Sequence, residues 1–267
     1  MSLDERDTHL DDGRMTLAEH LGELRSRLIK CIVAVLIGTV FCFIFREPII
    51  NFLLGPLQNL PSDTSEPDTK LLVTDPLEVF TLAMKISAYG GVMLAMPVIL
   101  WQLWKFITPG LYDHERKLAV PFVLSAVILF VMGASIAFWT LPLALEFLQG
   151  IMGGDNFAYL YTPSNWTQFV LTMMVAFGVG FEFPIVLIFL QIVGLLQPAS
   201  LAKWRPYAYV IIFVIVAVIT PSGDPISLCA LAVPMIIFYE ASIVIGKIFA
   251  RRKARKLAAE AGPVIDL

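Results

Sequence analysis

The sequence predicts an all-α, polytopic membrane protein with six transmembrane helices. Apolar residues make up 58% of its 267 residues and charged residues only 15%, whereas a soluble domain carries charges at about a quarter of its positions. The apolar residues gather in runs close to the roughly 20 residues that a helix needs to cross the hydrocarbon layer. Lys and Arg gather between alternate runs. Together these observations exclude a soluble domain.

Six apolar runs are the predicted spans: residues 28–45, 79–103, 118–147, 166–193, 207–220 and 226–249. Four runs contain prolines, namely Pro97, Pro121 with Pro142, Pro184, and Pro234. A proline removes a helical hydrogen bond, so kinked helices are expected. The fifth run is short, because the 15 residues between Arg205 and Pro221 form a helix of only roughly 22 Å. Two interpretations stay open: a short span that thins the bilayer, or a re-entrant hairpin made by the last two runs.

The basic residues predict the orientation of these spans. Residues 1–30 carry five Lys and Arg, the segments after the second and fourth runs carry three and two, and the C-terminal segment carries six, which is 16 of 19. Positively charged segments stay in the cytoplasm, so both ends are predicted to be cytoplasmic. All five tryptophans lie near predicted span ends, as an interfacial belt requires: Trp101, Trp104, Trp139, Trp166 and Trp204.

Three regions are expected along the chain. Residues 1–15 form a flexible acidic N-terminus, residues 16–249 a single six-helix transmembrane domain, and residues 250–267 a basic cytoplasmic tail. Within the domain, residues 46–78 hold five prolines and the apolar patches 49–57 and 71–73, which favours a structured cap on the outer membrane surface. No internal repeat is evident, which weakens a transporter built from duplicated halves.

Several kinds of chemistry are not expected. The three histidines (His9, His20 and His114) lie outside the predicted spans, so a transmembrane haem or buried histidine metal site has no ligands. The sequence contains no HExxH motif, no P-loop and no pair of intramembrane aspartates. The sequence therefore predicts neither an enzyme nor a protein that binds a metal, a cofactor or nucleic acid.

The segment 16–30 (TLAEHLGELRSRLIK) is predicted to be an amphipathic helix that runs into the first span. Its leucines lie at heptad-like spacing, at Leu17, Leu21, Leu24 and Leu28. Thr16 and Glu19 match a capping box, and Glu23 can pair with Arg27 at i,i+4. The segment is either a helix on the bilayer surface or a docking face for a partner peptide.

The segment 106–117 (FITPGLYDHERK) combines a Pro-Gly turn with charged and apolar side chains. Asp113 and Glu115 can complement the dipole of the next helix. That explanation leaves Leu111 and Tyr112 exposed to water without a reason, which favours a binding role.

Three further acids lie within or between the later runs. An ionised Glu182 inside the fourth run costs at least ~2.5–3.5 kcal/mol, and Lys85 is expected too near the outer face to pair with it. Glu182 is therefore either a packing contact or a functional polar site. Asp224, in the turn TPSGDP, and Glu240, which can snorkel toward Lys247, are weaker candidates.

At four segments, EHLGELRSRL, FITPGLYDHERK, FGVGFEFP and TPSGDP, the sequence resembles the TatC family in order and spacing, over residues 16–249. The resemblance implies a six-span core subunit of the twin-arginine protein translocase in the bacterial inner membrane, driven by the proton-motive force. It implies that twin-arginine signal peptides of folded precursor proteins bind at the cytoplasmic face. The partners it implies are single-span TatA-like and TatB-like subunits, further copies of the chain in a hetero-complex, and the lipid bilayer.

The resemblance also implies site residues. Glu23 and Glu115 would bind the signal, with Glu19 a weaker candidate, and Glu182 would line a membrane-facing wall that contacts partner subunits or the inserted signal. Further members of the signal-binding patch would be Leu24, Arg25, Pro109, Leu111 and Tyr112. Two other functions stay open: a proton-coupled secondary transporter with Glu182 as proton carrier, and a passive scaffold that binds membrane subunits and no peptide.

Overall fold

A computed structural model describes residues 17–58, 73, 75–107, 119–152 and 162–260. All regular structure in these residues is helical, which confirms the predicted all-α class. The helices are α1 (Leu17–Ile44), α2 (Arg46–Gln58), α3 (Glu78–Ile107), α5 (Ala119–Met152), α6 (Pro163–Phe181), α7 (Phe183–Ile192), α8 (Pro198–Lys203), α9 (Arg205–Ile219) and α10 (Pro225–Glu260).

Five helical segments in the described residues are long and apolar enough to cross a membrane: α1, α3, α5, α6 together with α7, and α10. The fifth predicted span is the shorter apolar helix α9, with 15 residues. The observed fold is therefore five long apolar helices plus one shorter one. Of the segment 46–78, for which a cap on the outer surface was predicted, residues 46–58 form α2, and residues 59–72 lie outside the described residues.

The prolines act differently from one helix to the next. The fourth run breaks at Glu182, which separates α6 from α7, and Pro184 lies in the first turn of α7, where its missing N–H costs no hydrogen bond. Pro121 likewise lies in the first turn of α5. Helices α3 and α10 continue through Pro97 and Pro234, so proline ends the helix in only one of these runs.

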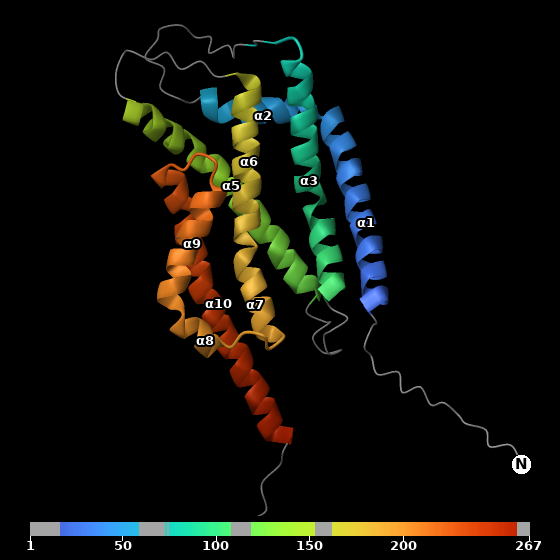
Figure 1. The fold of residues 1–267 in the computed structure, drawn as a ribbon, viewed down its shortest axis with the longest axis vertical. Coiled ribbons are helices and arrows are strands. Elements are labelled where there is room, and N and C mark those ends of the chain that lie inside the picture. The colour runs from blue at the N-terminus through green and yellow to red at the C-terminus, as the bar shows by residue number, and fades with distance from the viewer. Residues whose placement is uncertain (1–16, 59–72, 74, 108–118, 153–161, 261–267) are drawn as a thin grey trace, which may run out of the picture.

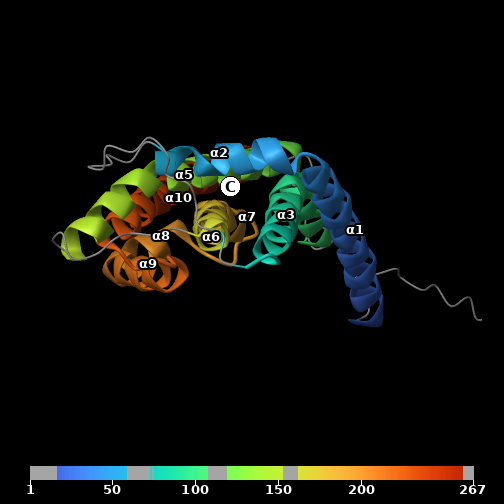
Figure 2. The same cartoon turned by 90° about the horizontal axis from the view of Figure 1, so that it is seen from above.

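The long helices stand side by side, with α6 and α7 at the centre (Figures 1 and 2). Helix α5 crosses behind α6 at a steep tilt, and α1 lies at one edge of the bundle along α3. Helix α2 lies across one end of the bundle, roughly perpendicular to the spans, as a helix on the membrane surface would. It is fixed there by the Trp166 indole, which donates to the carbonyl of Leu53 at 2.9 Å.

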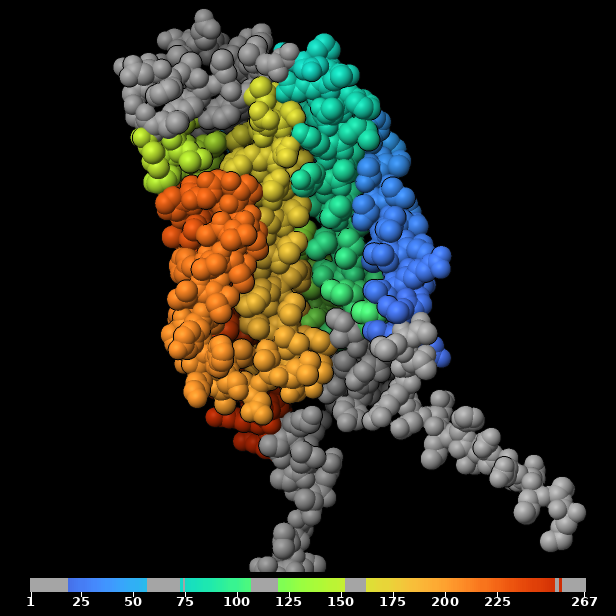
Figure 3. Space-filling view, in the orientation of Figure 1, coloured from blue at the N-terminus to red at the C-terminus, as the bar shows by residue number. Residues whose placement is uncertain are grey.

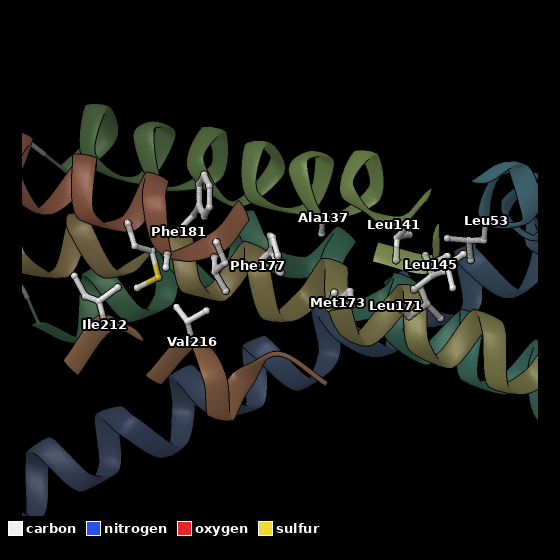
Figure 4. Packing of buried hydrophobic residues seen from close by; sticks show 14 of the residues in the cluster. Leu53, Ala137, Leu141, Leu145, Leu171, Met173, Phe177, Phe181, Ile212 and Val216 are labelled. Carbon is white, nitrogen blue, oxygen red and sulfur yellow. The ribbon is translucent and has the colours of Figure 1, made fainter. Parts of the chain in front are cut away.

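The core follows α6. Val170, Met173, Phe177 and Phe181 of this helix are fully buried, and they meet side chains from α5 and α9 (Figure 4). Outward-facing positions stay apolar: Val218 is 81% exposed. Apolar exposure on this scale marks a surface that faces lipid rather than water.

Helix α1 is held to α3 by close backbone contact at small residues. A Cβ added to Gly91 of α3 would lie 2.3 Å from the hydroxyl oxygen and 2.6 Å from the amide nitrogen of Thr39 in α1. A Cβ added to Gly38 would lie 2.8 Å from the carbonyl oxygen of Gly91. Because lipid tails are as apolar as the helices, such close packing is what joins helices in a membrane.

The predicted tryptophan belt is wrong for two of its five members. Trp104 and Trp166 are buried, at 4% and 2% exposure. Trp104 packs against the rings of Phe122 and Phe189, and Trp166 bonds to α2. Position near a span end does not reveal which side of the helix a side chain occupies, and in both cases it is the inner side.

The described basic residues gather at the end of the bundle where α1 begins and α3, α7 and α10 end (Figure 1). They include Arg25, Arg27, Lys30, Lys105, Lys203, Arg205, Lys247, Arg251, Arg252 and Arg255. We call this the basic end. Of the described residues, Arg46 and Lys85 are the basic ones toward the opposite end.

Candidate functional site

A polar pocket opens at the basic end, between the first turns of α1 and the last turns of α3. Its lining residues are Glu23, Ser26, Arg27 and Lys30 from α1, and Gln102 and Lys105 from α3. The four α1 residues recur at i, i+3, i+4 and i+7, so they share one face of the helix. We call this the α1–α3 pocket.

The two helices bring these side chains together for separate reasons. Helix α1 has 28 residues, or about 42 Å, so it continues beyond the roughly 30 Å hydrocarbon layer as one helix rather than as a separate surface helix. The glycine contacts hold α1 against α3 within the membrane. At the basic end, the His20 ring stacks on Phe106 with 4.4 Å between centroids, which keeps the helices together up to the pocket.

The two carboxylate oxygens of Glu23 differ in their hydrogen bonding. Arg27 donates two hydrogen bonds to Oε1, one from Nε at 3.0 Å and one from Nη2, which confirms the predicted i,i+4 pair. Oε2 is buried and has no hydrogen-bond partner among the described residues. The carboxamide Oε1 of Gln102 is likewise buried and has no hydrogen-bond partner among the described residues. A buried acceptor without a donor is unfavourable, so the pocket is suited to a ligand that donates hydrogen bonds.

The other predicted patch residues are placed unevenly. Leu24 lies next to the pocket face and is 42% exposed. Arg25 is exposed and two positions from Glu23, which puts it on the opposite side of α1. Glu19 is exposed one turn earlier, on the pocket face. Four members lie outside the described residues: Pro109, Leu111, Tyr112 and Glu115. The helix ends that bound their segment, at Ile107 and Ala119, both lie at the basic end (Figure 1).

Sequence reasoning missed Gln102, Ser26 and Lys30. Ser26 and Lys30 could have been found from the helical spacing that they share with Glu23. Gln102 gives no local signal, because it reaches the pocket only through the packing of α3 on α1.

Glu182 forms a second candidate site, at the break between α6 and α7. Its Oε1 is buried without a hydrogen-bond partner among the described residues. It shares a helix face with Val179 and Val186, which are 52% and 49% exposed. The surface of α6 and α7 is open between α3 and α9 (Figure 3). Glu182 therefore lies at the margin of a surface that faces the membrane.

Lys85 does not serve as the partner of Glu182. Its ammonium donates to the side chains of Gln168 at 2.7 Å and Ser164 at 3.3 Å. Gln168 precedes Glu182 by 14 residues, about 21 Å along a helix. Lys85 therefore lies well away from Glu182, toward the end of the bundle opposite the basic end.

Two of the three weaker candidates, Asp224 and Glu240, have structural partners. Asp224 is 2% exposed, and its carboxylate accepts from the Ser227 amide at 2.7 Å and from the Ser222 hydroxyl, so it caps the start of α10. Within the described chain, no group of three or more His, Cys, Asp or Glu could hold a metal ion.

Glu240 also differs from its expectation. It accepts from the Arg205 guanidinium at 2.6 Å and from the Tyr209 hydroxyl at 2.7 Å, rather than reaching along its own helix to Lys247. The reason is that α9 packs alongside α10, so these donors lie directly across from the carboxylate.

Comparison with known proteins identifies a family model and relatives that match this chain. Residues 19–234 match the family model described as Sec-independent protein translocase protein (TatC). The chain is 42% identical over 241 residues to the TatC protein of Aquifex aeolicus, covering 90% of this chain and 98% of that protein. It is 37% identical over 265 residues to the TatC protein of Frankia casuarinae, covering 97% and 72%.

The fold is similar to a solved structure as well. A crystal structure of the twin-arginine translocase receptor TatC in the detergent DDM superposes with a TM-score of 0.71 and 40% sequence identity, covering 85% of this chain and 99% of that one. Sequence and fold agree over most of the molecule. The chain therefore belongs to the TatC family of Sec-independent protein translocase proteins, and it is a transport protein and not an enzyme.

Proposed function

We propose that this chain, the receptor subunit of a twin-arginine translocase, binds the paired arginines of a signal peptide with Glu23 and Glu115 at its cytoplasmic face. The observation that carries the proposal is the unsatisfied Oε2 of Glu23 in the α1–α3 pocket. Glu115 enters through the family motif, in a segment whose bounding helix ends lie at the basic end. Family membership favours this function over a proton-coupled transporter or a passive scaffold.

The chemistry of the signal fits such a pair of acids. Two adjacent guanidinium groups require two carboxylates, and the planar fork of Arg matches a carboxylate in a way that a lysine ammonium does not. Exposed ion pairs contribute only about 0.2–1 kcal/mol, too little to select one dipeptide. The partly buried Glu23 carboxylate supplies the desolvation that selectivity needs, since losing one partner of a buried charge pair costs about 2–5 kcal/mol.

The orientation and partners belong to the same proposal. The chain is placed in the bacterial cytoplasmic membrane with six spans and with both termini inside, because the basic end then faces the cytoplasm. The open face that carries Glu182 is assigned to single-span TatA-like and TatB-like subunits or to the inserted signal. We also propose homo-oligomers within this hetero-complex, and export driven by the proton-motive force.

The test measures binding of a fluorescent twin-arginine peptide to the purified protein. Glu23→Gln and, separately, Glu115→Gln are expected to weaken binding about tenfold, because each leaves one guanidinium without a charged acceptor. A peptide with Lys-Lys should bind the wild type less well than Arg-Arg. Glu47→Gln is the matched control, because Glu47 is exposed on α2 at the opposite end. Wild-type affinity in either folded variant would remove that residue from the site, and equal affinity for both peptides would refute selection by the Arg fork.

A further inference from the structure

Two acceptor oxygens from different helices share the α1–α3 pocket, and neither has a hydrogen-bond donor in the part of the chain that the structure describes. One is Oε2 of Glu23 in α1 and the other is Oε1 of Gln102 in α3. The two residues are 79 positions apart in the chain, so the pair exists only because α1 packs along α3. The second oxygen of Glu23 is already bonded to Arg27, which leaves one free acceptor on each wall.

This arrangement restricts the kind of group that the pocket can hold. Both orphan oxygens are satisfied at once only by a ligand with several N–H or O–H donors. A guanidinium carries five N–H groups in one plane, spread widely enough to meet acceptors on two walls. An ammonium is a compact, strongly hydrated charge whose three donors diverge from a single nitrogen, so it matches acceptors on two separate walls less well than a guanidinium does.

We infer that Gln102 is a specificity-determining residue for the twin-arginine signal, whose carboxamide oxygen accepts from the same guanidinium that Glu23 binds. The inference rests on the proposed function and adds a neutral acceptor to its two acids. The Glu23 carboxylate attracts any cation, whereas the Gln102 carboxamide oxygen accepts a further hydrogen bond that suits a planar guanidinium. Gln102 therefore contributes more to the preference for Arg over Lys than to binding of positive charge.

The pocket is also lined by cationic side chains. Whether these side chains are already bonded decides between a cationic and an anionic ligand. Arg27 is bonded to Glu23, and the Lys105 ammonium lies 5.2 Å from the centroid of the Trp101 ring. An anionic group such as a lipid phosphate would fit Lys30, but it has no donor for the two orphan oxygens and would be repelled by Glu23. The orphan oxygens therefore favour a guanidinium over a phosphate.

The experiment compares Arg-Arg and Lys-Lys signal peptides on the purified full-length protein. Gln102→Leu removes the acceptor at similar size and is expected to weaken Arg-Arg binding about fivefold while changing Lys-Lys binding little, so the preference for Arg falls. Gln102→Glu restores an acceptor and should keep Arg-Arg binding at or above the wild-type level. Gln149→Leu, near the far end of α5, controls for the substitution itself.

The outcomes separate this inference from the proposed function. Gln102→Leu deletes an unsatisfied buried acceptor, so its thermal unfolding midpoint should not fall. If Gln102→Leu binds both peptides as the wild type does while Glu23→Gln does not, the role of Gln102 is refuted and the proposed function stands. If neither variant changes binding, both fail. If Gln102→Leu leaves peptide binding unchanged and Gln102→Glu lowers the amount of phosphatidylglycerol that copurifies with the protein, the pocket holds a lipid phosphate and the inference is overturned.

Discussion

At the level of single residues, the acidic side chains discussed above fall into two groups, according to whether the fold leaves one of their carboxylate oxygens buried without a hydrogen-bond partner among the described residues. Asp224 caps α10 and Glu240 bonds to α9. In contrast, Oε2 of Glu23 and Oε1 of Glu182 are buried without a hydrogen-bond partner in the described part of the chain. Since buried polar groups are normally satisfied, the first two acids are explained by stability, and the last two are where a ligand or partner is expected.

For Glu182, the proposed contact with a single-span subunit gives a clear expectation. Glu182→Ala should leave binding of the signal peptide intact, because the α1–α3 pocket lies on other helices, and it should lower photo-crosslinking to the partner subunits from probes at Val179 and Val186. A probe at Ile37 on α1, 67% exposed, serves as control. Undiminished crosslinking from both valines would return Glu182 to a packing role.

For Glu240, the fold itself is the expected readout. Glu240→Leu leaves the Arg205 guanidinium and the Tyr209 hydroxyl without their acceptor, so α9 loses its polar link to α10 and the unfolding midpoint in detergent should fall. Tyr209→Phe removes one of the two bonds and should lower it less. Glu146→Leu, an exposed acid on α5, is the control. A midpoint equal to that of the wild type would show that the link contributes nothing measurable.

At the level of helices, hydropathy predicted the spans well because their length is set by the bilayer rather than by neighbours. The predicted run 79–103 lies within α3 and 207–220 nearly coincides with α9. Helix α1 begins at Leu17, as expected for an amphipathic segment 16–30 that runs into the first span. The six-residue α8 was not predicted, because it is too short to leave a periodic signal.

The candidate site was predictable only where its residues are close in sequence. The Glu23–Arg27 pair follows from i,i+4 spacing on one helix. Gln102 and the buried positions of Trp104 and Trp166 depend on which helices pack together, and hydropathy carries no such information. The break at Glu182 followed from Pro184, but the absence of a partner for Glu182 required the whole fold.

The contact between α1 and α3 supports a prediction about helix packing. Gly91→Leu places a side chain where a Cβ alone would meet the backbone of Thr39 at 2.6 Å, so the helices must separate, at a cost of about 1–3 kcal/mol. Because the α1–α3 pocket spans both helices, binding of the signal peptide should weaken as well. Gly150→Leu on α5, where nothing lies within 4 Å, should change neither. A variant with wild-type stability and binding would show that this contact does not join the helices.

At the level of the whole molecule, the two ends of the bundle differ in charge and in how far the individual helices extend toward them. The basic end collects the starts and ends of most helices, while α2 lies across the opposite end (Figure 1). The turn between α9 and α10 does not reach the level of α2, because α9 has only 15 residues. The bilayer must therefore be thinned around this hairpin if α9 is a true span.

The short-span and re-entrant interpretations predict different access to that turn. In a background without Cys31, Cys42 and Cys229, Pro221→Cys should react with a membrane-impermeant maleimide from outside the cell, but more slowly than Glu47→Cys on α2, because the turn lies deeper. Lipids with longer acyl chains should slow it further, since they increase the mismatch with α9.

Lys203→Cys on α8 should react only after the membrane is opened, because α8 lies at the basic end. If Pro221→Cys reacts from neither side while Glu47→Cys and Lys203→Cys behave as expected, the last two helices form a re-entrant hairpin. Four long helical segments, α1, α3, α5 and α6 with α7, then carry the fold across the membrane. Because α9 begins and α10 ends at the basic end, Arg251→Cys should react only after the membrane is opened under either interpretation, and it serves as a second control beside Lys203→Cys.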